Sequence, residues 1–192
     1  MWLGVPRPVL CSTMKETRLL IVSLSALVLF ACGPETTHAD PALLDELDST
    51  LTPNSKVLVT DGKLVSGLYF IVDSGYGYPR KVDRERLYID PAPIITAGNM
   101  VHIRTDQGMD GSTVVVFEMD ALGAARWQVA TRKSIGKRIA IVVRNQVISS
   151  PNVMDEIPGG RASLAPGMGS STRAEDLAQL LKEDRDRVPA VR

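Results

Sequence analysis

The chain has 192 residues and carries 22 basic and 22 acidic side chains, so its formal net charge at neutral pH is zero. This balance, without a basic stripe, excludes a typical nucleic-acid-binding protein. The two cysteines, Cys11 and Cys32, both lie near the N-terminus, so the rest of the chain offers no thiol for a disulfide or a cysteine-based site.

The N-terminal region has the pattern of an export signal. Residues 14–18 are basic, and residues 19–31 form a mostly apolar run that is too short to span a bilayer as a permanent helix. The run ends in Leu29, Phe30 and Ala31, directly before Cys32. A small residue suits peptidase cleavage, and a thiol can accept acyl chains. We therefore predict a bacterial lipoprotein signal peptide over residues 14–31, with diacylglycerol and palmitate on Cys32.

Two features around this signal carry further expectations. Residues 1–13 contain two prolines that no export signal needs, so we expect an extension upstream of the true start at Met14. Gly33, directly after the lipid-bearing cysteine, resembles the outer-membrane sorting pattern of proteobacterial lipoproteins. We expect a protein held in the cell envelope by its acyl chains and facing the periplasm, with the outer membrane favoured over the inner. An ordinary secretory signal with an incidental cysteine is the alternative.

Residues 32–40 are polar and turn-rich, which predicts the acylated cysteine followed by a flexible tether. Residues 41–51 predict a short helix capped by Asp40. From there to residue 111 we expect a small β-rich part. Its candidate strands are residues 56–60, 64–72, 87–89, 94–95 and the segment around His102.

The stretch over residues 112–183 has clearer signals. The predicted elements, in order, are a strand at 114–119, a helix at 120–135, strands at 138–143, 146–149 and 162–164, and a helix at 172–182. This β-α-β-β then β-α order predicts an α+β fold, closed as a two-layer sandwich of the ferredoxin-like kind. Residues 184–192 are expected to form a disordered tail.

The sequence predicts no catalytic residue, no metal and no cofactor. The folded region lacks a cysteine and a second histidine beside His102, so a zinc site or a histidine-based triad has almost nothing to be built from. Its candidate acids show no paired spacing with a nucleophile or base. These acids are Asp73, Asp106, Asp110, Glu118 and Asp120, the last of which is better used as a helix cap.

A series of motifs occurs in fixed order across residues 114–182. They are Phe117-Glu118-Met119, Gly123-Ala124-Ala125-Arg126-Trp127, Thr131, Gly136-Lys137-Arg138-Ile139-Ala140-Ile141-Val142, Val147-Ile148-Ser149-Ser150-Pro151, Ile157-Pro158-Gly159-Gly160-Arg161-Ala162 and Ala174-Glu175-Asp176-Leu177-Ala178-Gln179-Leu180-Leu181. This region resembles the head subdomain of the first periplasmic domain of SecD, a membrane component that assists bacterial protein export. The resemblance implies the head fold and a part in export.

The chain also departs from that family pattern. SecD is a polytopic protein whose membrane helices couple export to the proton gradient, and we expect this chain not to act as a motor alone. Its predicted hairpin turn is Arg144-Asn145 where the family commonly has Asp-Gly, and asparagine tolerates the positive φ that such a turn needs.

Two groups of residues are candidates for contacts. Leu122, Ala125 and Val129 form an apolar stripe on the predicted helix, which is either covered by residues 41–111 or serves as a partner or self-association surface. The predicted hairpin strand, comprising Gln146, Val147, Ile148 and Ser149, is a candidate for contact with extended polypeptide.

The sequence favours one class of function over two others. We expect a lipid-anchored, non-enzymatic periplasmic binding module that contacts a protein partner or polypeptide client, with the membrane bound through acyl chains and no nucleic acid involved. A structural or envelope-assembly lipoprotein using the fold as a scaffold is the alternative. An enzyme is the third reading, which the scattered acids do not favour.

Overall fold

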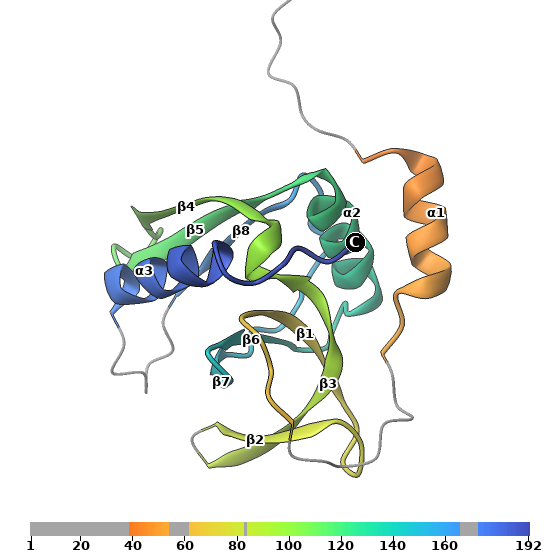
Figure 1. Cartoon of the computed structure of the whole chain (residues 1–192), viewed down its shortest axis with the longest axis horizontal. Helices are drawn as coiled ribbons and strands as arrows, with labels where there is room; N and C mark the ends of the chain where they lie inside the picture. Colours follow the sequence, from red (N-terminus) through yellow and green to blue (C-terminus); the bar gives the residue numbers. More distant parts are fainter. Residues whose placement is uncertain (1–38, 54–61, 83, 166–172) are drawn as a thin grey trace, which may run out of the picture. The chain divides into compact units, whose positions relative to one another are not determined.

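A computed structural model describes residues 39–53, 62–82, 84–165 and 173–192 (Figure 1). In chain order its elements are α1 (Pro41–Thr50), β1 (Gly67–Val72), β2 (Tyr78–Val82), β3 (Glu85–Thr96), the 3-10 helix η1 (Ala97–Asn99), β4 (Met100–Gln107), β5 (Thr113–Met119), α2 (Ala121–Lys133), β6 (Ile139–Val143), β7 (Gln146–Ser149), β8 (Arg161–Leu164) and α3 (Ala174–Arg185). The predicted α+β class and the element order from β5 onward are confirmed. Within these ranges, no helix is both long and apolar enough to cross a membrane.

The predictions for the N-terminal region fall on residues outside these ranges. They include the extension over residues 1–13, the signal peptide, the lipidation site Cys32 and most of the tether. The strand predicted at residues 56–60 lies outside them too.

The described strands pair in two antiparallel sheets. One has the order β2-β3-β1-β6-β7 and the other the order β4-β5-β8. Strands β5 and β6, which α2 connects, therefore belong to different sheets, and β1 pairs with both β3 and β6. Each sheet thus combines strands from before and after residue 112. The boundary predicted between residues 111 and 112 does not separate two structural units.

Strand β3 differs from its prediction. The sequence predicts two short extended pieces around Pro91 and Pro93, whereas the structure has one strand of 12 residues that runs through both prolines. Strand β2 pairs with residues 85–89 of this strand, and β1 pairs with its other side between residues 88 and 96. Its pairing with β1 contains register shifts near Pro93, where a proline without an N–H is tolerated.

Strand β6 of the five-stranded sheet is buried on both faces. Along β6, Ile139 and Ile141 face the main core together with Leu68 of β1, and the intervening Ala140 and Val142 join a second, smaller cluster. This alternation follows from the two-residue period of a strand. It explains why residues 139–143 are apolar without interruption, since neither face meets water.

Helix α2 is capped as predicted, because the Asp120 side chain accepts a hydrogen bond of 2.6 Å from the Gly123 amide. Its second apolar stripe is covered. Ala125 and Val129 are each 0% exposed and Leu122 is partly buried against the core. The reading of this stripe as a partner surface is therefore wrong for these residues, because the chain itself removes them from solvent.

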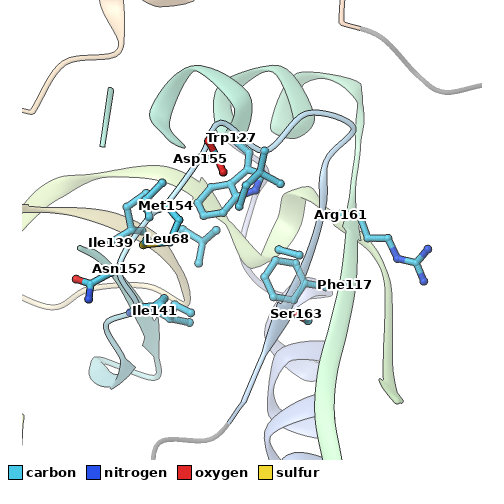
Figure 2. A pocket seen from close by; sticks show the side chains of 14 residues that line it. Leu68, Phe117, Trp127, Ile139, Ile141, Asn152, Met154, Asp155, Arg161 and Ser163 are labelled. Carbon is cyan, nitrogen blue, oxygen red and sulfur yellow. The ribbon is translucent and has the colours of Figure 1, made fainter. Parts of the chain in front are cut away.

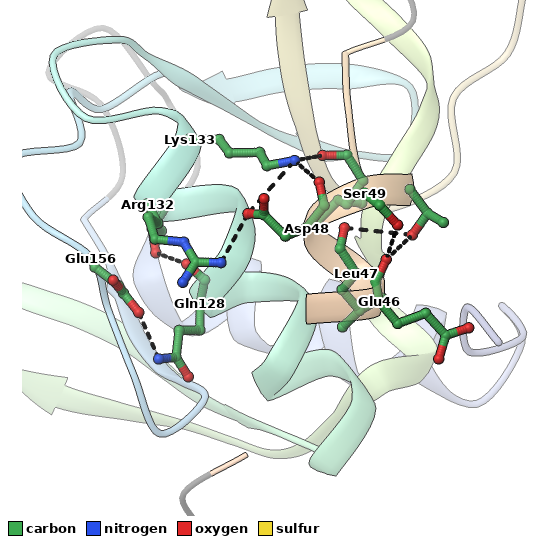
Figure 3. A network of polar contacts seen from close by, with 11 residues as sticks. Glu46, Leu47, Asp48, Ser49, Gln128, Arg132, Lys133 and Glu156 are labelled. Carbon is green, nitrogen blue, oxygen red and sulfur yellow. Dashed lines mark hydrogen bonds and ion pairs between the residues drawn. The ribbon is translucent and has the colours of Figure 1, made fainter. Parts of the chain in front are cut away.

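Helix α1 packs on α2. Leu47 of α1 is buried in the main core, and polar contacts flank it (Figure 3). Arg132 of α2 donates to Asp48 at 2.8 Å, and Lys133 donates to the backbone carbonyls of Asp48 and Leu51. The last two carbonyls belong to the C-terminal end of α1, where a cation also complements the helix dipole.

The C-terminal residues also differ from their prediction as a disordered tail. Helix α3 extends to Arg185, and the following segment returns past η1 toward the start of α2 (Figure 1). The Thr96 hydroxyl donates to the Pro189 carbonyl at 2.7 Å, and the Val191 amide donates to Asn99 Oδ1 at 3.0 Å. Polar pairing that is distant in sequence orders this segment, and the local composition does not reveal it.

Candidate functional site

An apolar cleft of about 420 Å³ lies between the two sheets (Figure 2). The five-stranded sheet contributes Leu68, Ile139 and Ile141. Strand β5 contributes Phe117, and β8 contributes Arg161, Ala162 and Ser163. Helix α2 contributes Trp127, and residues 151–157 complete the wall with Pro151, Asn152, Val153, Met154, Asp155 and Ile157.

The wall formed by residues 151–157 is held by the backbone after α2. Gly136 has a φ of +76°, which a residue with a side chain rarely adopts, and its amide donates to the Val153 carbonyl at 2.9 Å. The Val153 amide returns a bond of 2.9 Å to the Lys137 carbonyl, and the Ile157 amide donates to the Thr131 hydroxyl at 3.0 Å. The wall is therefore fixed at both of its ends.

The opposite wall is β8, an edge strand. It pairs with β5 on one side and is last in the order of its sheet, so no described strand pairs with its second side. Gly159 and Gly160, with φ of +79° and +63°, form the turn that leads into it. The Gly160 carbonyl accepts a bond of 2.9 Å from the Met119 amide, which aligns β8 with β5.

Trp127 brings to the lining a buried N–H group without a partner within the described ranges. The structure places its ring in the cleft lining with 6% exposure (Figure 2). Its Nε1 is buried and has no hydrogen-bond partner in the part of the chain that the structure describes. A buried donor left unpaired costs about 1–3 kcal/mol. The cleft thus combines apolar walls with one unsatisfied N–H group.

The candidate acids Asp106, Asp110 and Asp120 have structural roles away from the cleft. The Arg104 guanidinium lowers the pKa of Asp106, and hydrogen bonds from Ser112 lower the pKa of Asp110. Both acids lie at the β4–β5 hairpin, and Asp120 caps α2. Among residues 39–53, 62–82, 84–165 and 173–192, no group of three His, Cys, Asp or Glu side chains could hold a metal.

The candidate hairpin forms as predicted. Arg144 and Asn145 have φ of 49° and 69°, the combination that a two-residue hairpin turn requires. Strand β7 lies at the edge of the five-stranded sheet, with Gln146 exposed and Val147, Ile148 and Ser149 half-buried. Arg80 of β2 donates to the Asn145 carbonyl at 3.1 Å, so the turn is held against the opposite edge of the same sheet.

Sequence reasoning did not identify the cleft. An apolar side chain has the same sequence pattern whether it faces a core or a cleft. The lipidation and cleavage residues Cys32, Leu29, Phe30 and Ala31 lie outside the described residues.

The fold and the cleft define an α+β module with an apolar groove beside a free strand edge. The family model of the SecDF P1 head subdomain matches residues 76–184, more than half of the chain. The chain belongs to this family, which confirms the resemblance. The match also begins upstream of residue 114, so that β3 and β4 belong to it.

Individual relatives agree with this assignment. The chain is 32% identical to the protein translocase subunit SecD of Sebaldella termitidis over 91 residues, which cover 47% of the chain and 22% of that protein. It is 41% identical to SecD of Rhodothermus marinus over 68 residues, covering 35% and 11%. For SecD of Aquifex aeolicus the identity is 27% over 137 residues, covering 71% and 23%. The chain thus spans less than a quarter of each of these proteins.

Solved structures show the same likeness. A structure described as a membrane component SecDF that enhances protein export has 29% sequence identity and a TM-score of 0.44, and the match covers 52% of this chain and 44% of that one. SecDF in a super-membrane-facing form has 28% identity and a TM-score of 0.46, covering 57% and 14%.

Proposed function

We propose that this chain is a lipid-anchored, non-enzymatic module of the bacterial cell envelope that faces the periplasm and binds polypeptide segments in the service of protein export. The observation that carries the proposal is the apolar cleft between the two sheets of a SecDF P1 head-type fold. A cleft of this size accepts a few apolar side chains, which a folded protein hides and an unfolded one exposes.

The lining supports a non-enzymatic role. Its apolar residues gain free energy by covering apolar surface and have no means of transferring protons. The polar residues of the lining, such as Asn152, Asp155 and Arg161, can orient a bound chain. The relatives are named as protein translocase subunits, which is consistent with a polypeptide as the bound molecule.

The hairpin strand β7 is the proposed second contact. Gln146 is exposed, and the strand leads directly through Ser150 into Pro151, the first residue of the cleft wall. A bound chain that leaves the cleft at this end would next meet Gln146 and Ser149.

Photocrosslinking tests the binding proposal. A photoreactive amino acid at Met154, which lines the cleft and is 78% exposed, should capture unfolded export substrates in the cell. The matched control is Met109, which is fully exposed at the β4–β5 hairpin and does not line the cleft. Equal capture at both positions, or capture of peptidoglycan fragments alone at Met154, would contradict the proposal.

The anchor has a separate test. Metabolic labelling with a palmitate analogue should label the chain, and Cys32→Ser should abolish both the label and membrane association. A labelled Cys32→Ser variant would contradict the proposed anchor, without affecting the binding proposal.

A further inference from the structure

The second side of β8, next to the cleft, has backbone N–H and C=O groups that pair with no described strand. Ala162 and Ser163 of this strand line the cleft, and the strand's second side has no partner among the described strands. Along such an edge every second residue directs its N–H and C=O away from the paired neighbour. A ligand seated in the cleft therefore meets backbone donors and acceptors on one side and apolar side chains on the other.

The buried indole N–H of Trp127 is a second, independent group that lacks a hydrogen-bond acceptor in the described part of the chain. Trp127 Nε1 has no partner in the described residues, although its ring is 94% removed from solvent. Buried polar groups in proteins are nearly always hydrogen-bonded, so an exception at a binding site points to a group that the ligand supplies. A carbonyl oxygen is the acceptor that every residue of a polypeptide carries.

We propose that an extended polypeptide segment binds by adding a strand to the free edge of β8, placing alternate apolar side chains in the cleft and a carbonyl oxygen on Trp127 Nε1. This inference rests on the proposed function and specifies how its site recognises a chain. Recognition through the backbone gives affinity for many sequences, and the cleft restricts alternate positions to apolar residues.

The same observations argue against an acyl chain as the occupant. A hydrocarbon chain would fill the apolar walls but would leave the β8 edge and the Trp127 N–H without partners. Covering the β8 edge by hydrocarbon also removes its backbone N–H and C=O groups from water, which is unfavourable. An extended polypeptide can cover the apolar walls with its side chains and form hydrogen bonds with the polar groups through its backbone.

Binding to the full chain can be measured with one capped peptide of alternating leucine and threonine, with lysine at both ends. N-methylation of all leucines removes the N–H groups along one edge of the peptide, and N-methylation of all threonines removes those along the other. We expect one of the two methylated peptides to bind at least tenfold more weakly and the other to bind nearly as well as the parent. Equal binding of all three would overturn strand addition.

Hydrogen exchange and the indole signal give independent readouts. The parent peptide should slow exchange at alternate amides of β8, and it should shift the indole N–H resonance of Trp127, which Trp127→Phe assigns against Trp2. Decanoate, as an acyl-chain probe, should leave both unchanged. Trp127→Phe keeps an aromatic ring and should weaken peptide binding roughly fivefold, as the loss of one hydrogen bond does.

The outcomes separate the two proposals. Peptide binding that is blocked by a bulky residue at Ser163 but insensitive to N-methylation, with no protection of β8, would leave the polypeptide-binding function standing and contradict strand addition. Decanoate binding with the same β8 protection, and no binding of any peptide, would contradict both.

Discussion

Gly160 lies so close to Ala124 that a Cβ atom added to Gly160 would come within 2.4 Å of the Ala124 Cβ. This approach joins the turn before β8 to helix α2, and hence one wall of the cleft to the element that carries Trp127. Gly160 also has a φ of +63°, where an L-amino acid with a side chain is strained. Two independent requirements therefore coincide at one glycine.

Gly160→Ala should lower the free energy of unfolding by about 2–4 kcal/mol, because it adds backbone strain and a steric clash. Gly159→Ala is the matched control, since Gly159 has a φ of +79° but nothing within 4 Å of an added Cβ. It should cost only about 1 kcal/mol. Urea unfolding of the two variants measures the difference, and equal losses would show that the close approach to Ala124 is not important.

Asn99 should be among the most sensitive polar residues. It is 0% exposed, its Oδ1 accepts from the Thr96 and Val191 amides, and its Nδ2 donates to Asp120 at 3.1 Å. Asn99→Ala should lower the free energy of unfolding by about 3 kcal/mol and speed hydrogen exchange at Val191. Asn152→Ala, at an exposed position, should change stability by less than about 0.5 kcal/mol. Unchanged exchange at Val191 in Asn99→Ala would contradict the role of Asn99 in holding the C-terminal segment.

The docking of α1 on α2 should depend on apolar burial more than on charge. Leu47→Ala removes a core side chain and should cost about 2–3 kcal/mol in thermal or urea unfolding. Asp48→Ala breaks an ion pair with Arg132 whose partners are both partly exposed, and it should cost less than about 1 kcal/mol. The reverse order of the two effects would show that the polar network of Figure 3 holds α1 in place.

Tyr69 should make the free energy of unfolding depend on pH in the alkaline range. Burial raises the pKa of the Tyr69 phenol above its ordinary value of 10.0, and the hydroxyl donates to the Val65 carbonyl at 2.9 Å. The unfolded chain ionises this phenol near pH 10 and the folded chain retains the proton. The free energy of unfolding should therefore fall as the pH rises above 10.0, by up to about 1.4 kcal/mol per pH unit. Tyr69→Phe should lose this part of the slope, and an unchanged slope in the variant would contradict the assignment.

Local signals in the sequence predicted local structure well. The caps at Asp40 and Asp120 and the positive φ at Asn145 each depend on residues a few positions apart, and each is present. The pairing of β1 between β3 and β6 could not be predicted in this way. Many apolar strands are compatible with one another, and the choice among them depends on how the whole chain closes.

The candidate site was predictable only in its hairpin. The Arg144-Asn145 turn has a local signature, whereas the cleft exists because Phe117, Trp127 and Ile141 come together from three elements. Likewise, the stripe of Leu122, Ala125 and Val129 has the same helical pattern whether α1 or a partner covers it. Burial of such a stripe depends on contacts that are distant in the sequence.

Binding of polypeptide in the cleft is tested most directly by the affinity for an unfolded export substrate. The affinity is measured for the parent chain and for a variant whose cleft is filled by a tryptophan side chain. Ser163→Trp places a large side chain at an exposed position of β8 that lines the cleft, and Thr105→Trp makes the same change at an exposed position of β4 in the same sheet. If the substrate binds in the cleft, Ser163→Trp weakens binding at least tenfold and Thr105→Trp leaves it unchanged. Equal affinity of both variants and the parent chain would contradict binding in the cleft.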